Sequence, residues 1–192
     1  MLRTPFMFSL LFSCPSGLPS TSRPLFVPAP PEQDESCPRG VAEPVVRKKV
    51  FPKTSFRRLP DKRTGLETVA LPLGDRLTIH HEGCEYYVLR FHFETARFRQ
   101  SPTALDAWFR NAAQLLTETA PGLDSPVDIA GGLRALRTYL DRHKGNKAQA
   151  LVLGQEIAYG SETLPSFVSV DRIARLAGNT VAVELSLAIG PL

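Results

Sequence analysis

The residues best suited to chemistry gather in one short run, His80-His81-Glu82-Gly83-Cys84-Glu85, with His92 on the following segment. Thiolate and imidazole together are ligands that suit zinc and copper. Successive side chains of a strand point to opposite faces, so His80 and His81 separate. We expect His80 to pair near Tyr86, and His92 to lie six residues further along that strand, about 20 Å away. At most His81, Cys84 and Glu85 can meet. We therefore expect no resident metal and name these three as the candidate ligands.

Cys84 has two further roles open to it. It can act as a nucleophile beside His81, which requires a lowered thiol pKa and partial exposure. Alternatively, it forms a disulfide. If the chain is exported and Cys14 is lipidated, Cys37 and Cys84 are the pair that remains, and a bridge would tie the segment around Cys37 to a hairpin. The sequence leaves both roles open, and no residue is assigned a catalytic one.

Other polar and aromatic residues fit structural roles. The start of one expected strand suits the mouth of a small-ligand site, because it carries Glu85, Tyr86 and Tyr87. Tyr87, however, is expected to face the core. Trp108 lies on a helical apolar stripe, which predicts core packing. Residues 159–162 (YGSE) lack the second glycine of a hydrolase elbow, and we interpret them as a loop. No Walker loop, GxGxxG, HExxH, GxSxG or paired CxxC motif occurs, so the sequence favours a protein without enzymatic activity or cofactor.

The first fourteen residues have the plan of an export signal. Arg3 precedes a short apolar stretch, and Ser13-Cys14 closes it. The tetrapeptide from Leu11 to Cys14 (LFSC) resembles a bacterial lipobox, in which the cysteine becomes the lipidated first residue. Phe12 departs from that pattern, because a small residue is usual there. We expect export with Cys14 as the lipidation candidate; the alternatives are a disordered N-terminus or a wrongly chosen start codon.

Composition divides the rest of the chain near residue 60. Residues 1–60 hold 11 of the 17 prolines and carry 9 Lys/Arg against 4 Asp/Glu, so we expect residues 15–60 to be an extended, basic tether. Its stretch 47–63 suits anionic lipid headgroups, a solvated linker or a first strand. Residues 61–192 carry 14 Lys/Arg against 15 Asp/Glu. This expected single globular domain therefore lacks the positive charge of a nucleic-acid-binding protein.

Alternating apolar residues predict the first strands of that domain. Val69, Leu71 and Leu73 share odd numbering with two later groups, and period two means one buried face. All odd positions face the core only if the hairpin loop has odd length, such as Glu82 to Cys84. The later members of the set are Leu77, Ile79, Leu89, Phe91 and Phe93.

Two amphipathic helices and a second group of strands follow. Ser101-Pro102 and Ser125-Pro126 each combine an N-cap residue with proline at the first helical position. Gly131-Gly132 inside the second helix predicts an irregular first turn or a close approach of another backbone. Strands are expected over residues 149–158, 167–176 and 180–189.

The order β-β-β-α-α-β-β-β predicts an α+β fold, with an antiparallel sheet of about five to six strands covered on one face by two helices. We expect the first helix to pack its apolar stripe on the central strands. The residues expected at this contact are Leu105, Trp108, Phe109 and Ala112 on the helix and Leu89, Phe91, Phe93, Val181, Val183, Leu185 and Leu187 on the sheet.

Three stretches carry a resemblance to bacterial secreted proteins and lipoproteins to which no activity is attached. They are residues 71–79 (LPLGDRLTI), 83–91 (GCEYYVLRF) and 181–192 (VAVELSLAIGPL), and the resemblance covers roughly residues 50–192. It implies an envelope protein and assigns no catalytic residue. The sequence thus favours a non-enzymatic binding or interaction domain on a tether, with an envelope protein or a small ligand as partner. The alternative is an envelope enzyme or metal-binding protein that uses His81 and Cys84.

Overall fold

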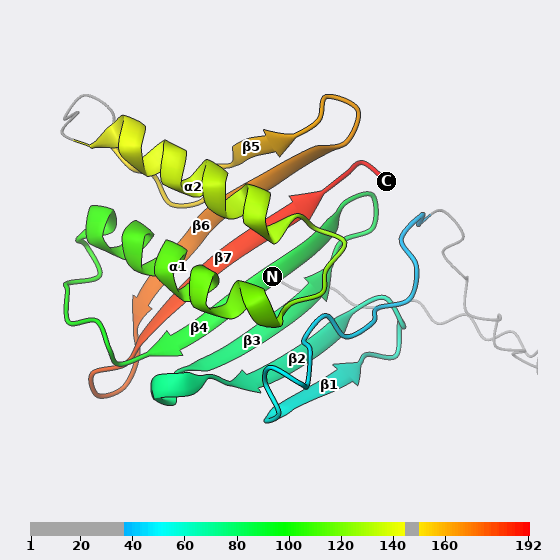
Figure 1. Cartoon of the computed structure of the whole chain (residues 1–192), viewed down its shortest axis with the longest axis horizontal. Helices are drawn as coiled ribbons and strands as arrows, with labels where there is room; N and C mark the ends of the chain where they lie inside the picture. Colours follow the sequence, from blue (N-terminus) through cyan, green and yellow to red (C-terminus); the bar gives the residue numbers. More distant parts are fainter. Residues whose placement is uncertain (1–36, 145–149) are drawn as a thin grey trace, which may run out of the picture. The chain divides into compact units, whose positions relative to one another are not determined.

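The computed structural model describes residues 37–144 and 150–192, which contain one antiparallel sheet of seven strands and two long helices (Figure 1). The strand order across the sheet is β1-β2-β3-β4-β7-β6-β5. The predicted α+β class is therefore confirmed, with one strand more than the upper expected number. The elements are β1 Thr54–Arg58, β2 Gly65–Ala70, β3 Arg76–Glu82, β4 Tyr87–Thr95, α1 Leu105–Thr119, α2 Ile129–His143, β5 Ile157–Gly160, β6 Pro165–Arg175 and β7 Val181–Ile189.

The register of the central strands places the odd positions on the core face, as predicted. Ile79 pairs with Phe91, which pairs in turn with Leu185, and all three side chains are fully buried. Two details of the expectation are wrong. The hairpin loop is longer than three residues, so His80 pairs with Arg90 rather than near Tyr86. His92 is therefore two residues beyond the partner of His80 instead of the expected six. Leu73 is 75% exposed because a one-turn 3-10 helix interrupts the alternation there.

Helices α1 and α2 cover the core face over β4, β7, β6 and β5 (Figure 1). The predicted contact is confirmed: Trp108, Phe91 and Leu185 are fully buried in one core. At Gly132 the helix lies so close to the sheet that an added Cβ would meet the Leu187 side chain at 2.7 Å. The glycine pair therefore permits close packing against side chains, rather than against another backbone.

Both helices begin later than their Ser-Pro pairs predict. The N-cap of α1 is Ala104, and that of α2 is Asp128, whose carboxylate accepts a hydrogen bond from the Gly131 amide at 2.8 Å. Ser101 and Ser125 instead hydrogen-bond within the preceding turns. A serine before proline is therefore also a turn signal. In α2 an aspartate further along supplies the cap, while α1 has no side-chain cap.

The boundary expected at residue 60 is wrong for the part of the tether that the structure describes. Val45, Val46 and Phe51 are buried in the core, and residues 54–58 form β1, the edge strand. We call residues 37–51 the strap. It lies next to the turn that follows α1 and covers the core face over β2 and β3, where the helices do not reach (Figure 1). The expectations for residues 1–36, including the signal, Cys14 and most of the tether, lie outside the described residues.

The other face of the sheet, which no element of the described residues covers, is here called the open face. It carries charged side chains in contact with one another. His92 lies 3.2 Å from Glu184, and Arg172 lies 3.6 Å from the same carboxylate. Arg90 pairs with Glu82 at 3.0 Å. This face is therefore built for water rather than for a second apolar layer. Among the described residues, no helix has the length and apolarity needed to span a membrane.

Candidate binding cleft under the strap

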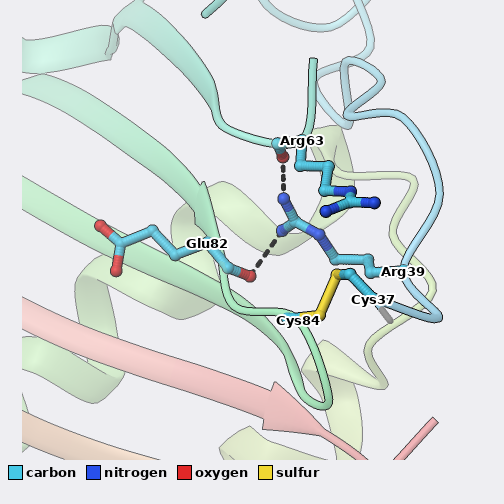
Figure 2. Close-up of a disulfide and its surroundings, with 5 residues drawn as sticks. All are labelled: Cys37, Arg39, Arg63, Glu82 and Cys84. Atoms are coloured by element: carbon cyan, nitrogen blue, oxygen red, sulfur yellow. Dashed lines mark hydrogen bonds between the residues drawn. A yellow bond between two sulfur atoms is a disulfide. The ribbon is translucent and has the colours of Figure 1, made fainter. Parts of the chain in front are cut away.

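A disulfide, side-chain hydrogen bonds and backbone hydrogen bonds hold the strap in place. Cys37 forms a disulfide with Cys84 in the β3–β4 loop, which is one of the two roles that the sequence left open for Cys84. The Arg39 guanidinium donates to the Glu82 carbonyl at 2.5 Å and to the Arg63 carbonyl (Figure 2). Further along the strap, backbone bonds join Ala42 to Lys62 and Arg47 to Gly122. A segment without regular structure is thereby fixed at both ends.

A buried carboxylate accepts hydrogen bonds from backbone amides in the middle of the strap. Glu67 of β2 is 1% exposed, and its two oxygens accept hydrogen bonds from the amides of Val45 at 2.8 Å and Val46 at 3.1 Å. The same carboxylate lies 2.8 Å from Nε2 of His81, whose Nδ1 lies 2.9 Å from the Tyr87 hydroxyl. Glu67, His81 and Tyr87 therefore form one hydrogen-bonded chain beneath the strap.

The roles within this chain follow from what each group can donate. A carboxylate only accepts, so Nε2 of His81 carries the hydrogen toward Glu67. In the neutral ring, Nδ1 then accepts from the Tyr87 hydroxyl. Burial raises the pKa of Tyr87 to about 12, so the phenol stays protonated near neutral pH and is not a base. The arrangement orients Tyr87 and binds the strap; it leaves His81 no free nitrogen for a metal.

The candidate metal ligands and nucleophile are not brought together for that chemistry. The Cys84 sulfur is bonded to Cys37 and has no thiolate to offer. Glu85 is exposed, and its carbonyl accepts from the Leu192 amide at 2.8 Å. His80 and His92 lie on the open face, away from His81. Within residues 37–144 and 150–192, no group of three or more His, Cys, Asp or Glu side chains is placed to hold a metal ion.

A cleft of about 530 Å³ opens between the strap, the start of β4, the end of β7 and the loops before α2 and β6. Three of its rim side chains are apolar and exposed: Val41 at 52%, Leu164 at 40% and Leu192 at 51%. Tyr87 and Arg39 are the buried polar residues that line it. The full lining is Arg39, Gly40, Val41, Glu43, Pro44, Val45, Tyr87, Asp124, Pro126, Leu164, Ile189 and Leu192. We call this the strap cleft.

Arg39 is the charged group of the cleft that is least accessible to water, with 6% of its surface exposed. Its hydrogen-bond partners, the Glu82 and Arg63 carbonyls, are neutral. Its Nε is buried without a hydrogen-bond partner, and no carboxylate of the described residues lies within ion-pair distance of the guanidinium. The ring of Tyr87 lies 5.5 Å from the guanidinium carbon, a cation–π contact that orients both side chains.

The sequence identified part of this site. Tyr87 lines the cleft, while Tyr86 lies outside it and packs against Phe167 with ring centroids 6.4 Å apart. Arg39 was missed because it lies in the proline-rich segment. Glu67 was missed although a signal was present: it has the odd, core-facing parity of Val69, and a charged residue at such a position requires a buried partner.

Two further expectations concern aromatic residues outside the cleft. Trp108 is in the core, as its helical spacing predicted. The segment 159–162 is only partly a loop, because Tyr159 and Gly160 complete strand β5.

Comparisons of the chain with protein-family models, with curated proteins and with solved structures found no match. Its function has to be inferred from the residues of the cleft.

Proposed function

We propose that this protein is an exported, non-enzymatic binding protein that holds a small ligand in the strap cleft. The observation that carries the proposal is the convergence, in one cleft of about 530 Å³, of exposed apolar side chains with two buried polar ones. Ligand sites have this composition: apolar walls supply most of the affinity, and a few fixed polar groups orient the ligand. The strap supports this role, because its attachments hold one wall of the cleft in place before a ligand arrives.

The disulfide supports export. A bridge such as Cys37–Cys84 persists in oxidising compartments and is rare in the cytosol, where thiols are kept reduced. This agrees with the signal-like plan of residues 1–14 and with Cys14 as an anchor. The test is fractionation of cells that express the full chain, with thiol alkylation before and after reduction. We expect envelope localisation, Cys37 and Cys84 protected until reduction, and release of a Cys14→Ser variant from the membrane. A cytosolic protein with free thiols would contradict export.

Binding is tested separately, with the purified full chain. Native mass spectrometry before and after organic extraction shows whether a small molecule co-purifies. A Leu164→Ser variant should lose that molecule, because Leu164 is an exposed part of the rim and its replacement leaves the core intact. Leu73→Ser is the matched control, since Leu73 is exposed outside the cleft. Equal retention by both variants would contradict the strap cleft as the binding site.

A further inference from the structure

Resting on that proposed function, we infer that the ligand is an amphipathic monocarboxylate, whose apolar body contacts the rim of the strap cleft and whose carboxylate pairs with the Arg39 guanidinium. Arg39 supplies the argument. A buried cation is ordinarily paired with an anion, because desolvation penalises an isolated charge. Arg39 is 6% exposed and lacks such a partner among the described residues. The ligand carboxylate would supply the missing anion.

Charge around the cleft limits the head group. The terminal nitrogens of Arg39 each donate one of their two N–H groups to the Glu82 and Arg63 carbonyls (Figure 2), which leaves three of the guanidinium's five N–H groups for an anion. A carboxylate can accept from them. Glu43 and Asp124 also line the cleft, and both are exposed. Water screens their charges, yet they disfavour a second negative charge on the ligand.

The apolar surface defines the rest of the molecule. Val41, Leu164 and Leu192 are three exposed apolar side chains around the same opening. Exposed apolar side chains that gather at one concave site mark a binding surface. A cleft of about 530 Å³ is in the usual size range of small-molecule sites, about 300–1,000 Å³. A medium-chain carboxylic acid satisfies both the rim and the buried guanidinium.

The test uses the full chain and three probes with the same ten-carbon tail: decanoate, decanol and decyltrimethylammonium. Isothermal titration calorimetry below the micellar concentration gives each dissociation constant. We expect decanoate to bind at least about tenfold more tightly than decanol, because a charge-assisted hydrogen bond in a desolvated site has about that effect. The ammonium probe should bind most weakly. Arg39→Gln should weaken decanoate by a similar factor and leave decanol unchanged.

Arg39 also holds the strap in place through its hydrogen bonds, so its replacement can impair folding. A second variant, which leaves Arg39 unchanged, keeps the proposal testable in that event. Val41→Glu puts a carboxylate on the exposed rim and should weaken decanoate more than decanol. Leu73→Glu is the matched control with the same charge outside the cleft. Equal affinity for decanoate and decanol overturns the carboxylate assignment and leaves the binding function standing. Failure of all three probes also overturns it, while the co-purification experiment judges the proposed function independently.

Discussion

One face of a single sheet is covered in two different ways. Over β4, β6 and β7 the cover is helical, and the contact is apolar, with Phe91, Leu185 and Trp108 fully buried. Over β2 and β3 the cover is the strap, and the same face presents Glu67 and His81. In both parts alternate strand residues face the cover and are buried. The parts differ in what covers them, which is a pair of helices in one and the irregular strap in the other.

The difference follows from backbone hydrogen bonding. A helix satisfies its interior amides itself, so the sheet beneath it needs only apolar side chains. The strap has no such ladder, and a buried amide without an acceptor costs about 1–3 kcal/mol. Glu67 supplies the acceptors for two consecutive strap amides. An irregular segment that covers a sheet therefore requires a polar group beneath it, and Glu67, paired with His81, is that group for the strap.

The largest expected effect is in the helix-covered part. Phe91→Ala should lower the free energy of unfolding by about 3–5 kcal/mol, because it removes a fully buried aromatic ring beneath α1. Urea denaturation of the purified protein measures this. A loss below about 1 kcal/mol would mean that the contact between α1 and the sheet is not the main core.

The second effect is in the strap. Replacing Cys37 and Cys84 by serine should lower the free energy of unfolding by about 2–4 kcal/mol, because the bridge closes a long loop. Hydrogen exchange at the Val45 and Val46 amides should accelerate, while amides of β4 and β7 keep their protection order. Cys14→Ser is the control and should change neither quantity. Uniform acceleration across the sheet would show that the disulfide stabilises the whole sheet and not the strap in particular.

The two covers also differ in how far the sequence predicts them. The helix-covered part is predicted by the spacing of apolar residues. Alternation in the strands places Phe91 and Leu185 on one face of the sheet, and helical spacing places Trp108 on the helix face that covers it. The strap was predicted as a tether, because proline-rich composition predicts extended chain but does not say whether that chain is bound. The sequence offered the pairing of Cys37 with Cys84 as one alternative, whereas the contacts of the strap amides with Glu67 depend on tertiary structure.

Glu67→Gln tests whether the strap depends on the Glu67 carboxylate as the acceptor for its amides. We expect a loss of about 1–3 kcal/mol in the free energy of unfolding, because the amide group has one oxygen and its NH2 would face a strap amide, donor against donor. Glu94→Gln on the open face is the matched control and should have little effect. Equal losses in the two variants would show that the strap amides do not depend on the carboxylate.

A smaller effect is expected from pH. Burial raises the pKa of Tyr87 to about 12, from 10.0. A raised pKa favours the neutral phenol in the folded state, so this contribution is complete below about pH 10 and declines as pH rises toward about 12. Between about pH 9 and pH 11 it should remove roughly 1 kcal/mol. Tyr87→Phe should show a correspondingly flatter decline of stability; an identical slope in both proteins would contradict a buried phenol.

The smallest effect is expected on the open face, at Glu184, which pairs with Phe91's neighbour His92 and with Arg172. Glu184→Ala removes two ion pairs in the same strand that holds Leu185, yet its partners keep access to water. Pairs of this kind contribute about 0–1 kcal/mol, so we expect a loss below about 1 kcal/mol in urea denaturation. Raising the salt concentration in the wild type should reproduce part of that loss, since screening weakens accessible pairs. A loss comparable to that of Phe91→Ala would mean that the open face is covered in solution, and that this sheet has a third cover beside the helices and the strap.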